Sequence, residues 1–281
     1  MVLPPASSSK NTYHKKILEA AYMNSKTPTE INKDILLPFL IYDKPFPYYG
    51  TITLYPVTMD NILLFQTLSQ SIIIRKDSIF HNKKIIKMSY LDFLIYAFGN
   101  KELETQYKIP YLSQYYLYAI QLLQLCCKDA EITMDQTGYL YINKILITPE
   151  IFDDLRRIII LQNEIDFDID EFLNYDTEQR LQKADTQNHK KDKITIEDYI
   201  DSLIIAMNTT ENQIINMTIR KFWRYIKRYQ LHENYTIAKT SEYSGLVSFK
   251  EPIPYWMVSL DEEDKYKHLK TDENELKGKI H

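Results

Sequence analysis

Glycine and cysteine are scarce in this chain, and their scarcity excludes several kinds of site. Only 5 of the 281 residues are glycine, each isolated from the others, so no glycine-rich loop is available to cradle a phosphate or a dinucleotide. The two cysteines, Cys126 and Cys127, are adjacent within an apolar run. Neighbouring cysteines rarely meet disulfide geometry and lack the spacing of a zinc site. We therefore expect two reduced, buried thiols, as is typical of a cytosolic protein.

Signatures of catalysis and of metal binding are lacking too. No serine stands in the Gly-x-Ser-x-Gly pattern of a nucleophile elbow, and apolar surroundings are expected to raise the pKa of both cysteines and keep them unreactive. The histidines are scattered, and none has a second histidine or a cysteine at a metal-ligand interval. They are His14, His81, His189, His232, His268 and His281. The sequence predicts no catalytic residue, no metal site and no cofactor, and we expect that the protein is not an enzyme.

An excess of positive charge is also missing. The chain has 34 lysines and arginines against 38 aspartates and glutamates, a formal charge of -4, so no global basic field favours nucleic acid as a partner. The N-terminal sequence MVLPPASSSK lacks the cationic start and apolar stretch of a secretory signal, and no apolar run reaches membrane-spanning length. We expect a soluble protein without a membrane partner, on which any basic surface is local.

Aromatic residues are plentiful instead. The chain contains 23 tyrosines and 11 phenylalanines, and 44% of its residues are hydrophobic, enough to fill the core of one large domain or two smaller ones. Large amphipathic rings combined with little glycine favour surfaces for protein contact over loops that bind phosphate.

The apolar periodicity predicts a mainly helical α+β fold. Residues 50–58, GTITLYPVT, alternate as in a strand and lead into a helix that begins near Met59. That helix is expected to bury Leu63, Leu64 and Leu68. The nearly apolar segments that follow predict interior helices.

Turn and capping residues mark the ends of these elements. Two alternating runs separated by Thr-Gly predict a small β-hairpin with its turn near Gly138. Helix starts are expected where a serine or threonine precedes an apolar pattern, because its side-chain oxygen can accept a backbone N–H of the first turn. The predicted caps are Ser89, Thr148, Thr195, Thr210 and Thr218.

Changes in composition predict the domain organisation. Residues 1–27 are expected to be a flexible arm, and residues 28–175 a helical α+β domain. The stretch 176–194 is charged and nearly free of apolar residues, which predicts a linker. A C-terminal helical domain is expected over 195–260 and a charged tail over 261–281.

One acidic segment, EIDFDIDE at residues 164–171, resembles the opening of a calcium-binding loop because carboxylates occupy alternate positions. The rest of that loop is missing, since Glu171 stands where the sharp turn needs glycine and Thr177 where a bidentate carboxylate is needed. On a strand the same alternation places carboxylates in water and the intervening apolar residues inward. We prefer that interpretation to metal binding.

A cationic and aromatic run, RKFWRYIKRYQ at residues 220–230, falls on the helix predicted after Thr218. Helical spacing places an apolar set on one face, namely Ile219, Phe222, Trp223, Ile226 and Tyr229. The opposite side carries a basic face, namely Arg220, Arg224, Lys227 and Arg228. This separation disfavours single-stranded nucleic acid, which needs rings and cations exposed together. A solvated face, a face for a protein partner and a major-groove reader remain open.

Three stretches together resemble tail assembly chaperones of phages that infect Gram-positive bacteria. They are GTITLYPVTMDNILLF, KMSYLDFLIYAFG and RKFWRYIKRYQLHENYTIAKTSEYSGLVSFKEPIPYWM. The resemblance covers most of the chain apart from the arm, the linker and the tail, and it includes no catalytic signature. It implies a protein of the host cytoplasm that binds the aggregation-prone tape measure protein, or other tail proteins, during tail formation and needs no cofactor. A homo-oligomer is compatible with this role.

The C-terminal part of the third stretch offers a client-binding patch. Two prolines and an adjacent Tyr-Trp pair are expected to pin this segment back onto the helical domain. If partly exposed, its apolar residues suit an apolar client. The residues of this predicted patch are Leu246, Val247, Phe249, Tyr255 and Trp256.

Two other functions fit the sequence. A structural tail or baseplate subunit would remain in the virion, whereas a chaperone would leave it. A helix-turn-helix regulator would use the basic face to bind DNA, although asparagine, glutamine and serine, which read base edges, are missing near the start of that helix.

Overall fold

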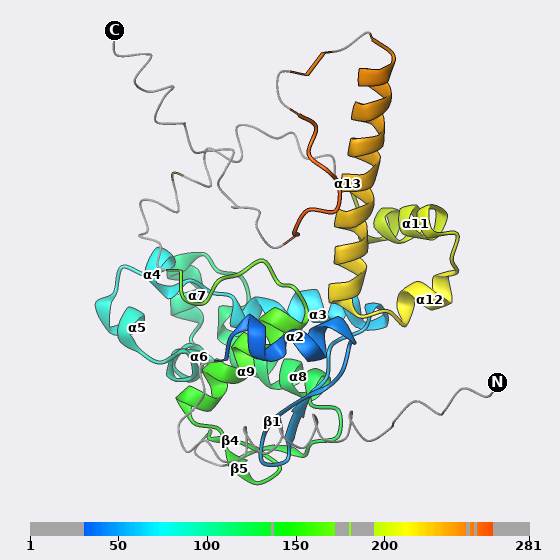
Figure 1. Ribbon diagram of the computed structural model, residues 1–281. Coiled ribbons are helices and arrows are strands. Elements are labelled where there is room, and N and C mark those ends of the chain that lie inside the picture. Colours follow the sequence, from blue (N-terminus) through cyan, green and yellow to red (C-terminus); the bar gives the residue numbers. More distant parts are fainter. Residues whose placement is uncertain are drawn as a thin grey trace, which may run out of the picture. The chain divides into compact units, whose positions relative to one another are not determined.

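The computed structural model (Figure 1) describes residues 31–135, 138–171, 180, 194–245, 248–249 and 252–260. Its contacts divide the chain into two compact units. The first unit comprises the described residues up to Val57, with Leu63–Ile74 and Asn82–Ile169. The second comprises Thr58–Ile62, Arg75–His81 and the described residues from Asp170 onward. The fold is mainly helical with two small antiparallel sheets, so the predicted fold class is confirmed.

The core of the first unit is helical. Helix α6 packs against α8 and α9, and α2 also packs against α9. Their buried residues recur at steps of three and four, as in Phe93 and Ala97 of α6 or Phe152 and Leu155 of α9. The elements are α2 (Lys33–Ile41), α3 (Ile62–Ser69), η2 (Gln70–Ile72), α5 (Lys83–Lys87), α6 (Tyr90–Ala97), α7 (Lys101–Tyr107), η3 (Leu112–Gln114), α8 (Tyr115–Cys126) and α9 (Pro149–Gln162).

Two predicted helix starts in this unit are confirmed by their hydrogen bonds. The backbone N–H of Asp92 donates to Oγ of Ser89 at 3.0 Å at the start of α6. The backbone N–H of Ile151 donates to Oγ1 of Thr148 at 3.3 Å, and Pro149 occupies the first turn of α9.

The predicted burial on α3 is partly wrong. Leu68 is buried, but Leu63 is 65% exposed and Leu64 is 50% exposed. The helix buries Ile62, Phe65 and Leu68 instead, which form one stripe at steps of three. Residues 63 and 64 therefore lie outside that stripe, although both are leucine.

The two sheets are short. Strand β1 (Phe46–Tyr49) pairs antiparallel with β2 (Ile52–Leu54), so the strand predicted within 50–58 is confirmed only in its middle. The predicted hairpin is confirmed by β3 (Ile132–Met134) and β4 (Leu140–Ile142), and β5 (Ile145–Leu146) extends the sheet. Gly138 has a φ of +89°, a conformation that favours glycine, in the turn between β3 and β4.

Side-chain amides at the end of α9 fasten the first sheet. The backbone N–H of Val57 donates to Oδ1 of Asn163 at 2.9 Å, and Nε2 of Gln162 donates to the carbonyl oxygen of Leu54 at 3.2 Å. Both amides are buried. The chain that leaves β2 is thereby held by side chains rather than by a third strand.

The second unit joins a short early segment to the C-terminal helices. Thr58 forms an isolated antiparallel bridge with Thr218, and the N–H of Met59 donates to the carbonyl oxygen of Met217 at 2.9 Å. Met59, Ile214 and Phe222 are all buried. The elements of this unit are η1 (Met59–Asn61), α4 (Lys76–Ile79), α11 (Ile196–Met207), α12 (Glu211–Ile215) and α13 (Ile219–Tyr243).

The three predicted C-terminal helices are confirmed. Thr195 and Asp198 form a reciprocal capping box at the start of α11, and the N–H of Lys221 donates to Oγ1 of Thr218 at 3.3 Å at the start of α13. Gly245, with a φ of +72°, follows the end of α13, where the left-handed conformation favours glycine. Among the described residues, no helix is both long and apolar enough to cross a membrane.

The predicted linker and ends remain untested. Of residues 176–194, only Arg180 and Ile194 are described, and the predicted arm 1–27 and tail 261–281 lie outside the described residues. The division into residues 28–175 and 195–260 stays a prediction.

Candidate functional site

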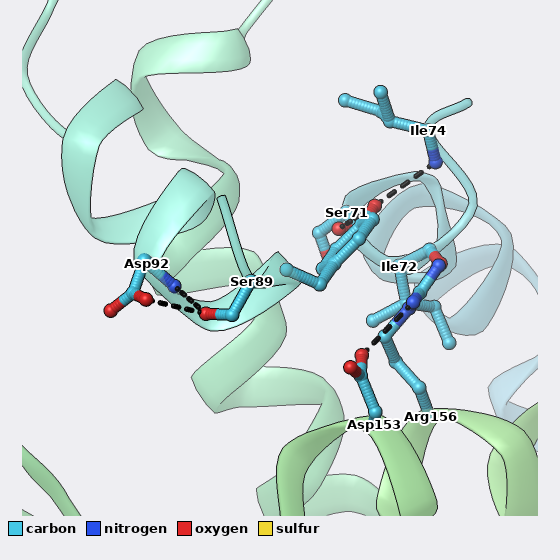
Figure 2. Close-up of polar contacts among 8 residues, drawn as sticks. Ser71, Ile72, Ile74, Ser89, Asp92, Asp153 and Arg156 are labelled. Carbon is cyan, nitrogen blue, oxygen red and sulfur yellow. Dashed lines mark hydrogen bonds and ion pairs between the residues drawn. The ribbon is translucent and has the colours of Figure 1, made fainter. Parts of the chain in front are cut away.

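A polar cluster in the interior of the first unit surrounds Arg156 of α9, which is 5% exposed (Figure 2). Its Nε donates to the carbonyl oxygen of Ile72 at 2.8 Å, and its Nη1 lies 3.2 Å from Oδ1 of Asp153. The guanidinium carbon lies 3.5 Å from the centroid of the Tyr90 ring. A buried arginine is stabilised when hydrogen bonds and an aromatic face replace its hydration shell, as they do here.

Tyr90 connects this cluster to the chain between η2 and α4. Its hydroxyl donates to the carbonyl oxygen of Ser71 at 2.9 Å and accepts from the N–H of Ile74 at 3.0 Å. Burial raises the pKa of Tyr90 to about 12, although the positive charge of Arg156 acts in the opposite direction. At neutral pH this hydroxyl is a fixed hydrogen-bonding group rather than a proton donor for catalysis.

The small recess beside Arg156 has no room for a substrate. It is too small to hold a water molecule. Apart from Arg156 its lining is apolar, and the residues are Ile72, Ala119, Leu122, Leu123, Phe152, Leu155 and Ile159. The cluster is therefore structural, because it joins α6, α9 and the 71–74 segment without offering a binding cavity.

The cysteines occupy the positions predicted for them. Cys126 and Cys127 are free thiols and both are buried. Burial raises the pKa of both, that of Cys127 to about 12. Because the thiolate is the reactive form, neither thiol is suited to nucleophilic chemistry.

The acidic segment 164–171 is irregular and not a strand. Asp166, Asp168 and Asp170 are exposed, while the apolar residues between them are half-buried, as the alternation predicted. Glu171 is engaged elsewhere, because Nη2 of Arg75 lies 2.6 Å from its Oε2. Among the described residues, no three histidine, cysteine, aspartate or glutamate side chains are grouped to hold a metal ion.

The predicted basic face of α13 does not exist as one surface. Arg220 is 6% exposed and belongs to the interior, whereas Arg224 is half-buried and Lys227 is exposed. Tyr229, assigned to the apolar face of the same helix, is 40% exposed. Helical spacing alone placed Arg220 on the side opposite the apolar set, but it could not reveal that Thr58 and Met59 pair with Thr218 and Met217 just before α13.

Arg228, the fourth residue of that set, binds the C-terminal strap, which we define as residues 252–260. Its Nη1 donates to the carbonyl oxygen of Trp256 at 2.6 Å and to that of Val258 at 3.0 Å. Two aromatic edges add to this contact, with ring centroids 5.0 Å apart for His232 and Trp256 and 5.5 Å apart for Tyr235 and Tyr255. The predicted pinning of this segment by its Tyr-Trp pair is confirmed.

Only three of the five residues of the predicted client-binding patch lie among the described residues. Leu246 and Val247 lie outside the described residues. Phe249 is 41% exposed, Tyr255 is 53% exposed, and Trp256 is half-buried against α13. The three described residues therefore divide into one anchor, Trp256, and two rings that retain much of their surface in water.

Further exposed apolar residues in the second unit were not predicted. Ile205 of α11 is 81% exposed, and Ile237 and Tyr243 of α13 are 63% and 83% exposed. The strap adds Met257 and Val258. The sequence does show these residues as isolated apolar positions on the polar side of each helix. Such positions are common on ordinary protein surfaces, so they did not indicate a binding surface.

Comparison with known families gives one match within this part of the chain. Residues 187–261 match the model of the YomV second domain, a phage-associated family. The matched segment includes α11, α12, α13 and the strap, and the match is consistent with a phage protein. Searches of curated proteins and of solved structures gave no match.

Proposed function

We propose that this chain is a phage tail assembly factor that acts by binding another protein, and that its client is the tape measure protein. Two similarities support the proposal: the match of residues 187–261 to a phage-associated family, and the resemblance of three stretches to tail assembly chaperones. The match concerns the unit that carries the strap and α13.

One observation carries the proposal, namely the large apolar side chains exposed along α13 and the strap. Tyr243 is 83% exposed, Ile237 63% and Met257 60%. Charged groups stand among them, as with Nζ of Lys239 and Oε2 of Glu242, which lie 2.9 Å apart. Flexible apolar side chains within a charged surrounding suit an adaptable contact with apolar client segments.

A structural tail or baseplate subunit is the second candidate, because the same surface suits a permanent partner. A DNA-binding regulator has less support. A groove-reading helix contacts bases through its N-terminal residues, but Ile219, Arg220 and Phe222 at the start of α13 are buried. Arg228 is engaged by two carbonyl oxygens of the strap.

The test is a pull-down of tagged protein from phage-infected cells, identified by mass spectrometry beside an analysis of purified virions. Recovery of the tape measure protein, with this chain missing from virions, is the expected result. This chain in virions would instead make it a structural component. Recovery of nuclease-sensitive DNA without tail proteins would overturn the proposal in favour of a regulator.

A further inference from the structure

Part of the contact between the strap and α13 is made by the strap's backbone. Arg228 binds the carbonyl oxygens of Trp256 and Val258, two residues apart, with a single nitrogen. Carbonyl oxygens are common to every peptide, so this part of the contact does not require the strap's own side chains. Pro252 and Pro254 restrict the start of the strap to extended backbone, since proline fixes φ and disfavours helix in the residue before it.

Two rings give the same surface its selectivity. The His232 ring meets Trp256 edge to face with an interplanar angle of 85°, and the Tyr235 ring meets Tyr255 at 90°. His232 and Tyr235 are three residues apart and therefore share one side of α13 with Arg228, one turn earlier. An adjacent aromatic pair that leads into a turn fits this side, because the two rings meet His232 and Tyr235 while the carbonyl oxygens of the turn accept from Arg228.

Three apolar residues of the strap keep much of their surface in water, while Ile253, Trp256 and Leu260 are half-buried. Tyr255 remains 53% exposed, Met257 60% and Val258 43%. Buried apolar area is the main source of binding free energy, and here it is small. Tethering compensates, because a segment on the same chain acts at an effective concentration on the order of millimolar. A contact held in this way can be displaced by a free segment that buries more.

We propose that the side of α13 that bears Arg228, His232 and Tyr235 is a docking site for peptide segments in which proline precedes an adjacent pair of aromatic residues and a turn follows them, as at Trp256 and Met257 of the strap. The strap occupies the site in cis and is displaced when such a segment of a partner binds. The biological role of the site rests on the proposed function, since a client would supply the segment. The docking itself is testable without any phage protein.

The experiment uses a fluorescein-labelled peptide of the strap sequence PIPYWMVSL and the full-length chain, with binding followed by fluorescence anisotropy. The variant Tyr255→Ala/Trp256→Ala weakens the strap without changing the site. We expect it to bind the peptide at least about tenfold more tightly than the wild type, because the competing cis contact is weakened. Adding Arg228→Ala to that variant should abolish the gain.

Matched controls make the result specific. Tyr42→Ala removes an aromatic ring that is 68% exposed and lies in the first unit, so it should bind the peptide as the wild type does. A peptide with alanine at both aromatic positions should not bind. The proposal is overturned if the strap variant binds no better than the wild type, or if Arg228→Ala has no effect on it.

A second measurement keeps the proposal testable should the strap variant fail to fold by circular dichroism. The chain has 2 tryptophans, so in the variant Trp223→Phe all tryptophan fluorescence comes from Trp256. Addition of the peptide PIPYFMVSL, which lacks tryptophan, should shift the emission of Trp256 to the red as the strap leaves α13. An unchanged emission at millimolar peptide would contradict displacement. Peptide binding without recovery of the tape measure protein would leave the site standing and remove only the proposed client.

Discussion

The guanidinium carbon of Arg156 lies 3.5 Å from the centroid of the Tyr90 ring, so a cation and an aromatic face meet inside the first unit. The two residues come from α9 and α6, and both also bind backbone of the 71–74 segment. A buried cation needs such partners because its removal from water is costly. The contact therefore ties three separate pieces of chain together, and its disruption should be measurable as lost stability.

Tyr90→Phe is expected to destabilise the protein strongly. The ring is kept, but the hydroxyl that serves the carbonyl of Ser71 and the N–H of Ile74 is lost. Two buried backbone groups without partners should lower the free energy of unfolding by about 2–4 kcal/mol. Urea unfolding followed by circular dichroism measures the change. Tyr118→Phe is the matched control, because its hydroxyl bond to Gln114 is exposed and its loss should cost less than about 0.5 kcal/mol.

The same hydroxyl predicts a loss of stability in alkali. Burial raises the pKa of Tyr90 to about 12 from its ordinary value of 10.0. Above about pH 10 the unfolded chain releases this proton while the folded chain keeps it, so the contribution of Tyr90 is complete below that pH and declines as the pH rises towards 12. Between about pH 8 and pH 11 the wild type should lose about 1 kcal/mol more than Tyr90→Phe. If the free energy of unfolding declined with pH equally in the wild type and in Tyr90→Phe, that result would contradict a buried, hydrogen-bonded hydroxyl of Tyr90.

Much of the fold could be predicted because its signals are local. The side chains of Ser89 and Thr148 each accept a backbone N–H only three residues further along the chain. Sequence spacing was therefore sufficient to predict both helix starts. The bridge between Thr58 and Thr218 could not be predicted, since no local pattern specifies a partner so distant in the chain. That bridge joins the residue before η1 to the residue before α13, and Arg220, two residues after Thr218, is buried. The exposure of site residues such as Arg220 was predicted wrongly because it depends on contacts between segments that are distant in the chain.

Arg220 and Lys227 should respond very differently to alanine, although both were assigned to one basic face. Arg220 is 6% exposed whereas Lys227 is exposed. Removal of a buried arginine loses the packing of its stem and leaves its polar neighbours unsatisfied, so Arg220→Ala should cost at least about 2 kcal/mol. Lys227→Ala should stay within about 0.5 kcal/mol. Thermal and urea unfolding of the two variants measure the difference. Equal losses of stability would mean that Arg220 and Lys227 lie on one solvated face after all.

Phe249→Asp should weaken client binding without unfolding the protein. The ring is 41% exposed, so a charge there is tolerated by the fold but disfavours an apolar partner. Trp256→Asp is a poorer probe, because Trp256 packs against His232. Ser248→Asp is the matched control, since Ser248 is exposed and adjacent. Co-expression with the tape measure protein, followed by measurement of the soluble fraction of that client, should show a loss with Phe249→Asp alone.

DNA affinity should be weak and should depend only modestly on salt. Of the predicted basic face, Arg220 is buried and Arg228 binds the strap, so at most Arg224 and Lys227, with the neighbouring Lys221, would have to supply the phosphate contacts. Two or three phosphate contacts predict that affinity falls roughly 10- to 40-fold between about 50 and 200 mM salt, against 1,000-fold or more for a protein with six to ten contacts. Anisotropy with a labelled duplex measures this dependence. A steep fall that Arg224→Glu/Lys227→Glu removes, with the fold unchanged, would mean that α13 reads DNA despite its buried start.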